Sequence, residues 1–451
     1  MVDASLAHES PCAIVLCGLP AGLEYNGSML TFIPTKSRRI AEAVLLSLAV
    51  TVLAAPAAAQ FRYDTEYPVI GYGKTPTTDA FTLAMQQHAG SLQHDALGRG
   101  YLDSLLAALN IDPASQVLVF SKTSLKQRFI TAENPRSLFF NDEVYVGYVP
   151  GSSTLEIGAM DPALGPVFFD FEQNPEAPER FEQQTSRCLR CHDSYSMTGG
   201  GVPRFMLSSV YAGPDGNLVS HELSEMTDTT TPLERRWGGW YVTGMHGSQR
   251  TLGNLVIRDT SVLRDPELAG VANVMTLDSI VALPNYLRPT SDIVALLVLE
   301  HQVEVQNRLT RLNYASRMQL AQGALDVAAL DTLTRPLLDS LFMAHEASLG
   351  APVTGSSEFA ANFQLKGLVD MQGRSLREFD LQTRTFRYPL SFLIYSDAIK
   401  GLPDSVRKFL FTRIKAVLES APDAPEYPHL SADQRSTILA ILRDTKPEVV
   451  E

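Results

Sequence analysis

The chain has 451 residues, of which 45% are hydrophobic and 19% are charged, and its formal net charge at pH 7 is −13. This composition excludes a disordered chain and a fibrous repeat, because both depart far from average residue usage. The acidic balance argues against a nucleic-acid partner, since phosphates attract basic proteins. The length is sufficient for two or three domains with cores of their own.

A segment typical of a secretory signal lies near the N-terminus. Basic residues at positions 36–39 precede an apolar run over 40–53, and three alanines follow at 57–59. This run is shorter than the ~20 residues that cross a bilayer, and small residues suit a signal peptidase. We therefore expect export to the periplasm or beyond, cleavage near Ala59, and no stable membrane span afterwards. An uncleaved anchor is the alternative.

The first 59 residues also bear on the start and the charge of the mature protein. Met29 precedes a signal of ordinary length, so the natural start is either Met1 or Met29. Cleavage leaves 34 Lys/Arg and 46 Asp/Glu, a net charge of −12. An acidic surface of this kind suits long-range attraction to a basic redox partner protein, although most proteins with this charge balance are simply soluble, which is the simpler interpretation.

Two of the four cysteines, Cys12 and Cys17, precede the expected cleavage site, so the mature chain keeps only Cys188 and Cys191. Exported chains usually place cysteines in a disulfide framework, but one pair so close in sequence has no such framework to build. The remaining pair is therefore predicted to serve local chemistry.

Residues 60–184 are predicted to form an α+β domain. Helix-like patterns cover residues 78–93 and 101–109. Four later segments are rich in β-branched and aromatic residues and are separated by turn residues, which predicts an antiparallel sheet. The turn at Gly151–Ser153 predicts a hairpin whose return strand begins at Thr154. The expected strands are 116–120, 143–149, 155–157 and 167–171.

The rest of the chain is predicted in two segments, 185–260 and 261–451. The first is dense in glycine, so loops are expected to dominate it. From Ser291 onward apolar residues recur at three and four residue steps, which predicts a long helix. A largely helical tail follows over 337–442. The fold class expected is α+β, with an N-terminal antiparallel sheet, a loop-rich middle segment and a mainly helical C-terminal half.

The middle segment contains Cys188-Leu189-Arg190-Cys191-His192. Thiols at this spacing can add to the two vinyl groups of one porphyrin, and the histidine that follows can ligate its iron as proximal ligand. We predict one covalent haem c, bound within residues 185–260. A disulfide, a thiol redox site and a zinc site are the alternatives. The polar residues 181–187 do not resemble the strand before a thioredoxin-type site, and zinc lacks an obvious fourth ligand.

Two further residues are placed by their distance or periodicity. Pro203, eleven residues beyond His192, could offer its carbonyl to the second imidazole nitrogen and so fix the ring, or could simply belong to a loop. His301 shares the apolar face of the predicted long helix, so we expect a core histidine more than a haem ligand.

The segment 235–247 holds both tryptophans of the chain beside basic residues. It is a candidate wall for the haem, with cations for the propionates, although the aromatic residues could equally be core. His246 or, as the alternative, Met245 could ligate the sixth position of the iron. The cofactor-binding candidates here are Arg235, Arg236, Trp237 and Trp240.

The chain resembles large exported bacterial proteins with a single C-x-x-C-H site, described as cytochrome c domain proteins. The likeness rests on residues 140–148, 237–247, 373–380 and 393–396. It covers most of residues 115–420. The resemblance implies covalent haem and periplasmic redox chemistry, with His192 as proximal ligand, and it favours His246 over Met245. It carries no settled reaction, and the single attachment site departs from dihaem peroxidases.

The leading hypothesis is an electron-transfer protein whose iron cycles between Fe(II) and Fe(III). The alternative is a monohaem enzyme with an open or displaceable sixth position that acts on a small oxidant such as peroxide. It is motivated by size, because a carrier does not need about 390 residues around one haem. A third possibility is a haem-based sensor or a subunit of a redox complex. The electron donor, the acceptor and any substrate are not defined by the sequence.

Overall fold

The computed structural model describes residues 67–95, 98–177, 179–193, 201–264, 268–420 and 426–451. All of them belong to one compact unit. The expected signal segment and its cleavage site lie outside the described residues, so both stay predictions.

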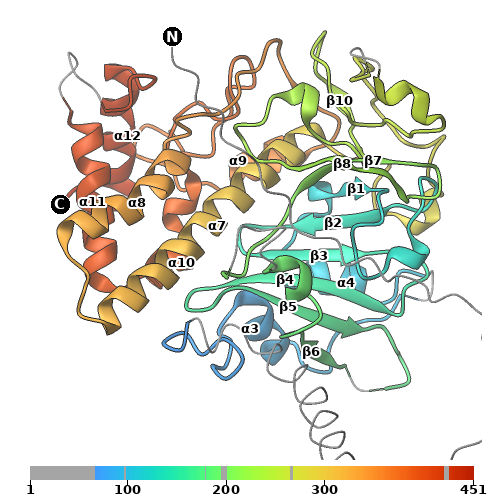
Figure 1. Cartoon of the computed structure of the whole chain (residues 1–451), viewed down its shortest axis with the longest axis horizontal. Helices are drawn as coiled ribbons and strands as arrows, with labels where there is room; N and C mark the ends of the chain where they lie inside the picture. Colours follow the sequence, from blue (N-terminus) through green and yellow to red (C-terminus); the bar gives the residue numbers. More distant parts are fainter. Residues whose placement is uncertain (1–66, 96–97, 178, 194–200, 265–267, 421–425) are drawn as a thin grey trace, which may run out of the picture. The chain divides into compact units, whose positions relative to one another are not determined.

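An antiparallel sheet forms the N-terminal half of this unit (Figure 1). Among the described residues, seven strands pair in the order β6-β5-β4-β3-β2-β1-β9. The antiparallel sheet expected from the sequence is confirmed. Its strands are β1 (Val117–Val119), β2 (Arg136–Phe140), β3 (Val144–Tyr148), β4 (Thr154–Asp161), β5 (Gly165–Glu172), β6 (Phe181–Gln183) and β9 (Trp240–Tyr241).

The predicted hairpin joins β3 to β4, and β4 begins at Thr154 as expected. Gly151 in its turn has φ +87°, a conformation that glycine adopts without steric cost. Strand β2, between β1 and β3, was not predicted. Its first two residues are Arg136 and Ser137, directly after Asn134-Pro135, so the segment lacks the β-branched pattern that marked its neighbours.

The two faces of the sheet are covered by different parts of the chain. On one face, the helices α3 (Ala80–Gln87) and α4 (Leu102–Ala108) supply apolar residues, and the rings of Phe81 and Phe169 lie 4.9 Å apart. On the other face Tyr145 and Phe168 flank Gly158, because these residues are register partners across β3, β4 and β5. This second face receives helix α7 and the segment 201–207.

The C-terminal half is mainly helical, as predicted. Asp292 caps α7 by accepting hydrogen bonds from the amides of Val294 and Ala295. Figure 1 shows α7 between the sheet and the helices α8, α11 and α12. None of the helices in the described ranges is long and apolar enough to cross a membrane. The helices are α7 (Ile293–Ala321), α8 (Val327–Leu341), α9 (Phe359–Leu365), α10 (Asp397–Lys400), α11 (Asp404–Leu418) and α12 (Ala432–Thr445).

One hydrophobic core runs through all three segments expected within residues 60–451. The middle segment contributes strand β9 to the edge of the sheet and two short pairs, β7 (Ser208–Ala212) with β8 (Leu218–Met226) and β10 (Gly244–Met245) with β11 (Thr354–Gly355). His301 is buried, with its Nε2 atom 2.8 Å from the hydroxyl of Ser391. It is therefore a core histidine, as the periodicity predicted.

Candidate haem site

The C-x-x-C-H motif forms one helical turn. Helix α5 (Leu189–His192) follows Cys188, whose carbonyl oxygen accepts from the amides of Cys191 and His192 at 3.2 and 3.1 Å. Leu189 is only 4% exposed and anchors the turn on the core. Cys188 is partly buried, Cys191 is exposed, and no disulfide joins them. The two thiols therefore lie one turn apart, as the spacing predicted.

The ring of His192 is fixed by two contacts. Its Nδ1 atom lies 2.8 Å from the carbonyl oxygen of Arg204, and its ring lies 4.3 Å from that of Phe168 on β5. A carbonyl can only accept, so Nδ1 carries the proton and the lone pair of the neutral ring is on Nε2. Burial lowers the pKa of His192 to about 4, which keeps the imidazole neutral at ordinary pH.

The carbonyl that accepts from the His192 ring is one residue further along the chain than the sequence predicted. The sequence pointed to the carbonyl of Pro203, whereas the structure uses the next carbonyl, that of Arg204. The amide of Arg204 in turn donates to the carbonyl of His192 at 3.0 Å. This reciprocal pair fixes the register of the two segments. Pro203 is buried and lines the cavity described below.

The environment of Cys188 does not favour a reactive thiol. Burial raises its pKa to about 12, and the nearby carboxylates of Asp170 and Glu156 act in the same direction. A thiol redox site needs the opposite, a thiol whose pKa is lowered. Zinc is also disfavoured, because no three His, Cys, Asp or Glu side chains are grouped for a metal in the described ranges.

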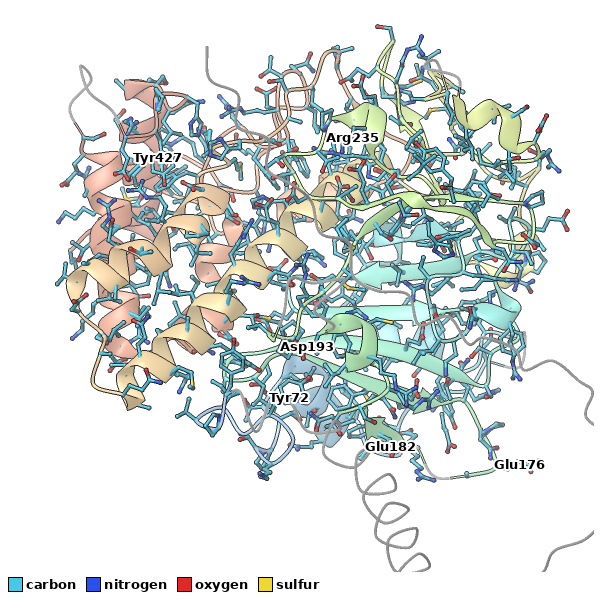
Figure 2. All side chains as sticks on the ribbon, viewed as in Figure 1. Tyr72, Glu176, Glu182, Asp193, Arg235 and Tyr427 are labelled. Atoms are coloured by element: carbon cyan, nitrogen blue, oxygen red, sulfur yellow. The ribbon has the colours of Figure 1, made fainter. Side chains whose placement is uncertain are left out.

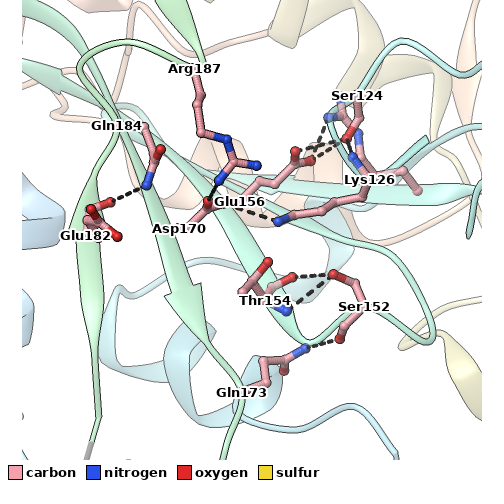
Figure 3. Close-up of polar contacts among 11 residues, drawn as sticks. Ser124, Lys126, Ser152, Thr154, Glu156, Asp170, Gln173, Glu182, Gln184 and Arg187 are labelled. Carbon is pink, nitrogen blue, oxygen red and sulfur yellow. Dashed lines mark hydrogen bonds and ion pairs between the residues drawn. The ribbon is translucent and has the colours of Figure 1, made fainter. Parts of the chain in front are cut away.

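Ion pairs cover the sheet surface beside Cys188 (Figure 3). Glu156 on β4 and Asp170 on β5 are register partners, so both project from the face that carries Phe168. Arg136 lies 3.0 Å from Glu156, and Lys126 lies 3.4 Å from Asp170. No pattern in the sequence indicated this cluster, because its members come from separate strands and loops.

Residues 202–205 and Leu207 also form part of the wall of a cavity of about 290 Å³. The facing wall is helix α7, where the side chain of Asn307 accepts from the amide of Phe205 and donates to its carbonyl, both at 2.9 Å. Asn307 therefore fixes the segment whose carbonyl holds His192. Sequence reasoning missed Asn307, since only the tertiary fold brings these segments together.

The arginines predicted to meet haem propionates have other roles. Arg236 is buried, and it pairs with Glu300 at 2.8 Å while also donating to the carbonyls of Thr229 and Thr231. Arg235 is exposed and pairs with Glu225. Figure 2 shows Arg235 near the top of the view and Asp193, the residue that follows His192, near its centre. Neither arginine is positioned beside the attachment turn.

Trp237 and Trp240 belong to the core around β7 and β9 and do not line a wall at His192. Both are buried, and the indole Nε1 of Trp240 donates to the carbonyl of Ser208 at 2.9 Å. Strands β9 and β5 are five inter-strand steps apart in the sheet, roughly 24 Å at ~4.8 Å per step. The tryptophans are therefore core residues, the alternative left open by the sequence.

The expectation that His246 or Met245 ligates the iron opposite His192 does not fit this fold. His246 is 2% exposed, and its Nδ1 and Nε2 atoms lie 2.8 and 3.1 Å from the carbonyl oxygens of Gln249 and Ala272. Met245 is 45% exposed on β10. Its neighbour Gly244 packs on Ile293 at the start of α7, whereas the Arg204 segment is tied to Asn307. Ile293 and Asn307 lie 14 residues apart in α7, which separates them by about 21 Å at 1.5 Å per residue. His246 and Met245 are therefore far from the histidine of the attachment turn.

No protein-family model matches this chain, and neither does any curated protein or solved structure. The resemblance to cytochrome c domain proteins thus stays a prediction from the sequence. What the chain offers chemically is two thiols that no disulfide joins, on one helical turn, and an oriented, neutral imidazole beside them.

Proposed function

We propose that this chain is an exported c-type cytochrome that carries one haem on Cys188, Cys191 and His192 and transfers single electrons. The contact between His192 Nδ1 and the Arg204 carbonyl carries this proposal. Ligated histidines usually donate their second ring nitrogen to such an acceptor, which sets the tautomer and aims the other nitrogen at the metal. No hydrogen-bond partner of Nε2 occurs within the described ranges.

The chain fits this group in further respects. A bound haem supplies an Fe(II)/Fe(III) couple that accepts or gives one electron. The chain itself provides two sulfur atoms for thioether bonds, and the ring of Phe168 lies beside His192 and 5.9 Å from that of Phe205. Burial keeps His192 neutral, the form that coordinates iron.

The direct test is mass spectrometry of the mature protein, produced with a signal peptide in a host that matures c-type cytochromes. We expect one haem mass on the peptide that contains residues 188–192, and a mature N-terminus near residue 60. Cys188→Ser/Cys191→Ser is the matched control, and it should lose the adduct while still being exported. A mature wild-type peptide without a tetrapyrrole, or with a disulfide, would contradict the proposal.

The second candidate, an enzyme with an open sixth position, is favoured by the contacts of His246. Both of its ring nitrogens approach backbone carbonyls, so the ligand expected to close that position is engaged elsewhere. An open iron admits a small oxidant such as peroxide.

Optical and electron paramagnetic resonance spectra of the ferric holoprotein separate the two functions. A low-spin spectrum that cyanide and peroxide leave unchanged supports the carrier. A high-spin spectrum that changes on adding either molecule, with consumption of peroxide, supports the enzyme.

The net charge of −12 expected after cleavage supports a basic redox protein as partner. Electron transfer to a basic acceptor protein should then slow as salt is raised from 0.01 to 0.15 M, where the screening length falls from ~30 to ~8 Å. An acidic acceptor of similar potential is the control. Equal rates with both acceptors at low salt would count against this partner.

A further inference from the structure

Three arginines line the cavity beside the segment 202–207. Its wall includes Arg204 from the segment 202–207 and Arg308 and Arg311 from α7. Arg308 and Arg311 are three residues apart in the helix and so share a face. Arg204 belongs to the wall opposite this helix, so the three guanidinium groups surround the same cavity.

Two acidic residues, Asp228 and Glu304, line the same wall and offset part of this charge, so the three arginines leave the wall positive by one charge. Glu304 is held by hydroxyl groups, with Thr229 Oγ1 at 2.5 Å and Ser340 Oγ at 2.7 Å. Asp228 accepts from the amide and the hydroxyl of Thr230 at 3.0 and 2.7 Å. Across the ranges that the structure describes, neither Arg308 nor Arg311 forms an ion pair or a hydrogen bond through its side chain.

The remaining wall is largely apolar and is held in place. Asn307 bonds both backbone groups of Phe205, and Glu304 fixes the opposite segment through Thr229. The volume of about 290 Å³ is many times the ~10–15 Å³ that one water molecule needs, so the cavity has room for a small organic ion. The apolar residues of the wall are Val202, Pro203, Phe205, Leu207, Met226 and Val303.

We infer that this cavity binds a small organic carboxylate, with Arg204, Arg308 and Arg311 around its negative end and the apolar wall around its body. Guanidinium groups match carboxylates in geometry and charge, and they bind them best where water is partly excluded. The six apolar residues of the wall can contact the body of an organic anion, which an inorganic anion lacks.

The carboxylate has two possible sources. It is either a free molecule or a propionate of the haem attached at Cys188 and Cys191, and the second source rests on the proposed function.

The first arm of the test titrates benzoate into the purified mature holoprotein at low ionic strength and follows the heat of binding. Benzamide, which has the same shape without the charge, is the ligand control. We expect saturable binding of benzoate and none of benzamide. Arg308→Gln/Arg311→Gln should weaken benzoate binding roughly tenfold or more, because charge-assisted hydrogen bonds are lost. Lys408→Gln/Arg443→Gln, which removes the same charge from exposed sites on α11 and α12, should not.

The second arm identifies a propionate as the occupant. In that case benzoate does not bind the holoprotein, but Arg308→Gln/Arg311→Gln shifts the propionate bending band in the resonance Raman spectrum and Lys408→Gln/Arg443→Gln does not. The inference is overturned if benzoate fails to bind and the band stays in place. It is also overturned if benzamide binds as well as benzoate, or if benzoate binding survives the double arginine variant.

Haem content, measured from the pyridine haemochromogen spectrum, separates this inference from the proposed function. A mature protein without haem contradicts the cytochrome, while its benzoate titration still reports on the cavity. Circular dichroism of both double variants verifies that they fold.

Discussion

His192 Nδ1 lies 2.8 Å from the carbonyl oxygen of Arg204, and the amide of Arg204 returns a hydrogen bond to the carbonyl of His192. This pair of contacts ties the C-x-x-C-H turn to the segment that enters β7. That segment is fixed in turn by Asn307 on α7. The orientation of the imidazole therefore depends on a helix more than a hundred residues away in sequence.

Replacing His192 by glycine should remove the proximal ligand while leaving both thiols for haem attachment. We expect the ferric spectrum of His192→Gly to lose the features of imidazole ligation, and added imidazole to restore them, because it can occupy the space of the side chain. His301→Gly, which empties a buried histidine site elsewhere, should show no such rescue. Identical spectra for His192→Gly and the wild type would rule out this ligand.

Asn307→Ala should destabilise the fold and loosen the proximal histidine. It leaves the backbone amide and carbonyl of Phe205 without their partner, at a cost of about 2 kcal/mol in the free energy of unfolding, measured by urea denaturation. The haem reduction potential should shift as well. Asn307→Asp keeps the acceptor for the Phe205 amide, so its free energy of unfolding should lie between those of the wild type and Asn307→Ala. Unchanged stability in Asn307→Ala would show that these bonds contribute little.

His246→Gln should leave the haem spectrum unchanged, because His246 contacts the carbonyls of Gln249 and Ala272 and lies far from His192. The loss of these buried contacts should lower the free energy of unfolding by about 1 to 3 kcal/mol. Optical spectra and urea denaturation measure the two effects. A change of spin state in His246→Gln would restore this residue as an iron ligand.

The buried pair Arg236–Glu300 predicts a pH dependence of stability. Burial raises the pKa of Glu300 to about 7, although Arg236 beside it acts to lower it. Between its ordinary value near 4.5 and 7, the folded state binds more protons at Glu300 than the unfolded state does. The free energy of unfolding should therefore fall as pH rises through this window. Glu300→Gln should remove that fall, by up to about 3 kcal/mol.

The next residue, His301, changes the free energy of unfolding with pH in the opposite direction. Burial lowers its pKa to about 3 from an ordinary value near 6.5, so the unfolded state binds more protons between these values. Its contribution to stability is complete above pH 6.5 and is lost as pH falls. His301→Gln should thus reduce acid sensitivity, whereas Glu300→Gln should increase it. Equal pH profiles for the two variants, measured by urea denaturation from pH 4.5 to 7, would contradict both assignments.

The sequence predicted the regular elements well where local patterns are strong. Helix α7 and the hairpin β3–β4 have clear periodicity and turn residues, and both formed close to the expected positions. Strand β2 was missed because its neighbours in the sheet, not its own residues, make it a strand. Strand β9 in the middle segment was missed for the same reason.

The attachment turn could be read from the sequence by itself, because five consecutive residues contain its thiols and its imidazole, and their spacing sets their geometry. What surrounds the imidazole was decided by tertiary structure. Proximity in sequence suggested Pro203 and the tryptophan segment as neighbours of the imidazole. Strand β9 of the tryptophan segment instead lies at the far edge of the sheet, and helix α7 places Asn307, Arg308 and Arg311 next to the segment that contains Arg204. Contacts between distant segments depend on how whole layers pack, and no local pattern encodes that packing.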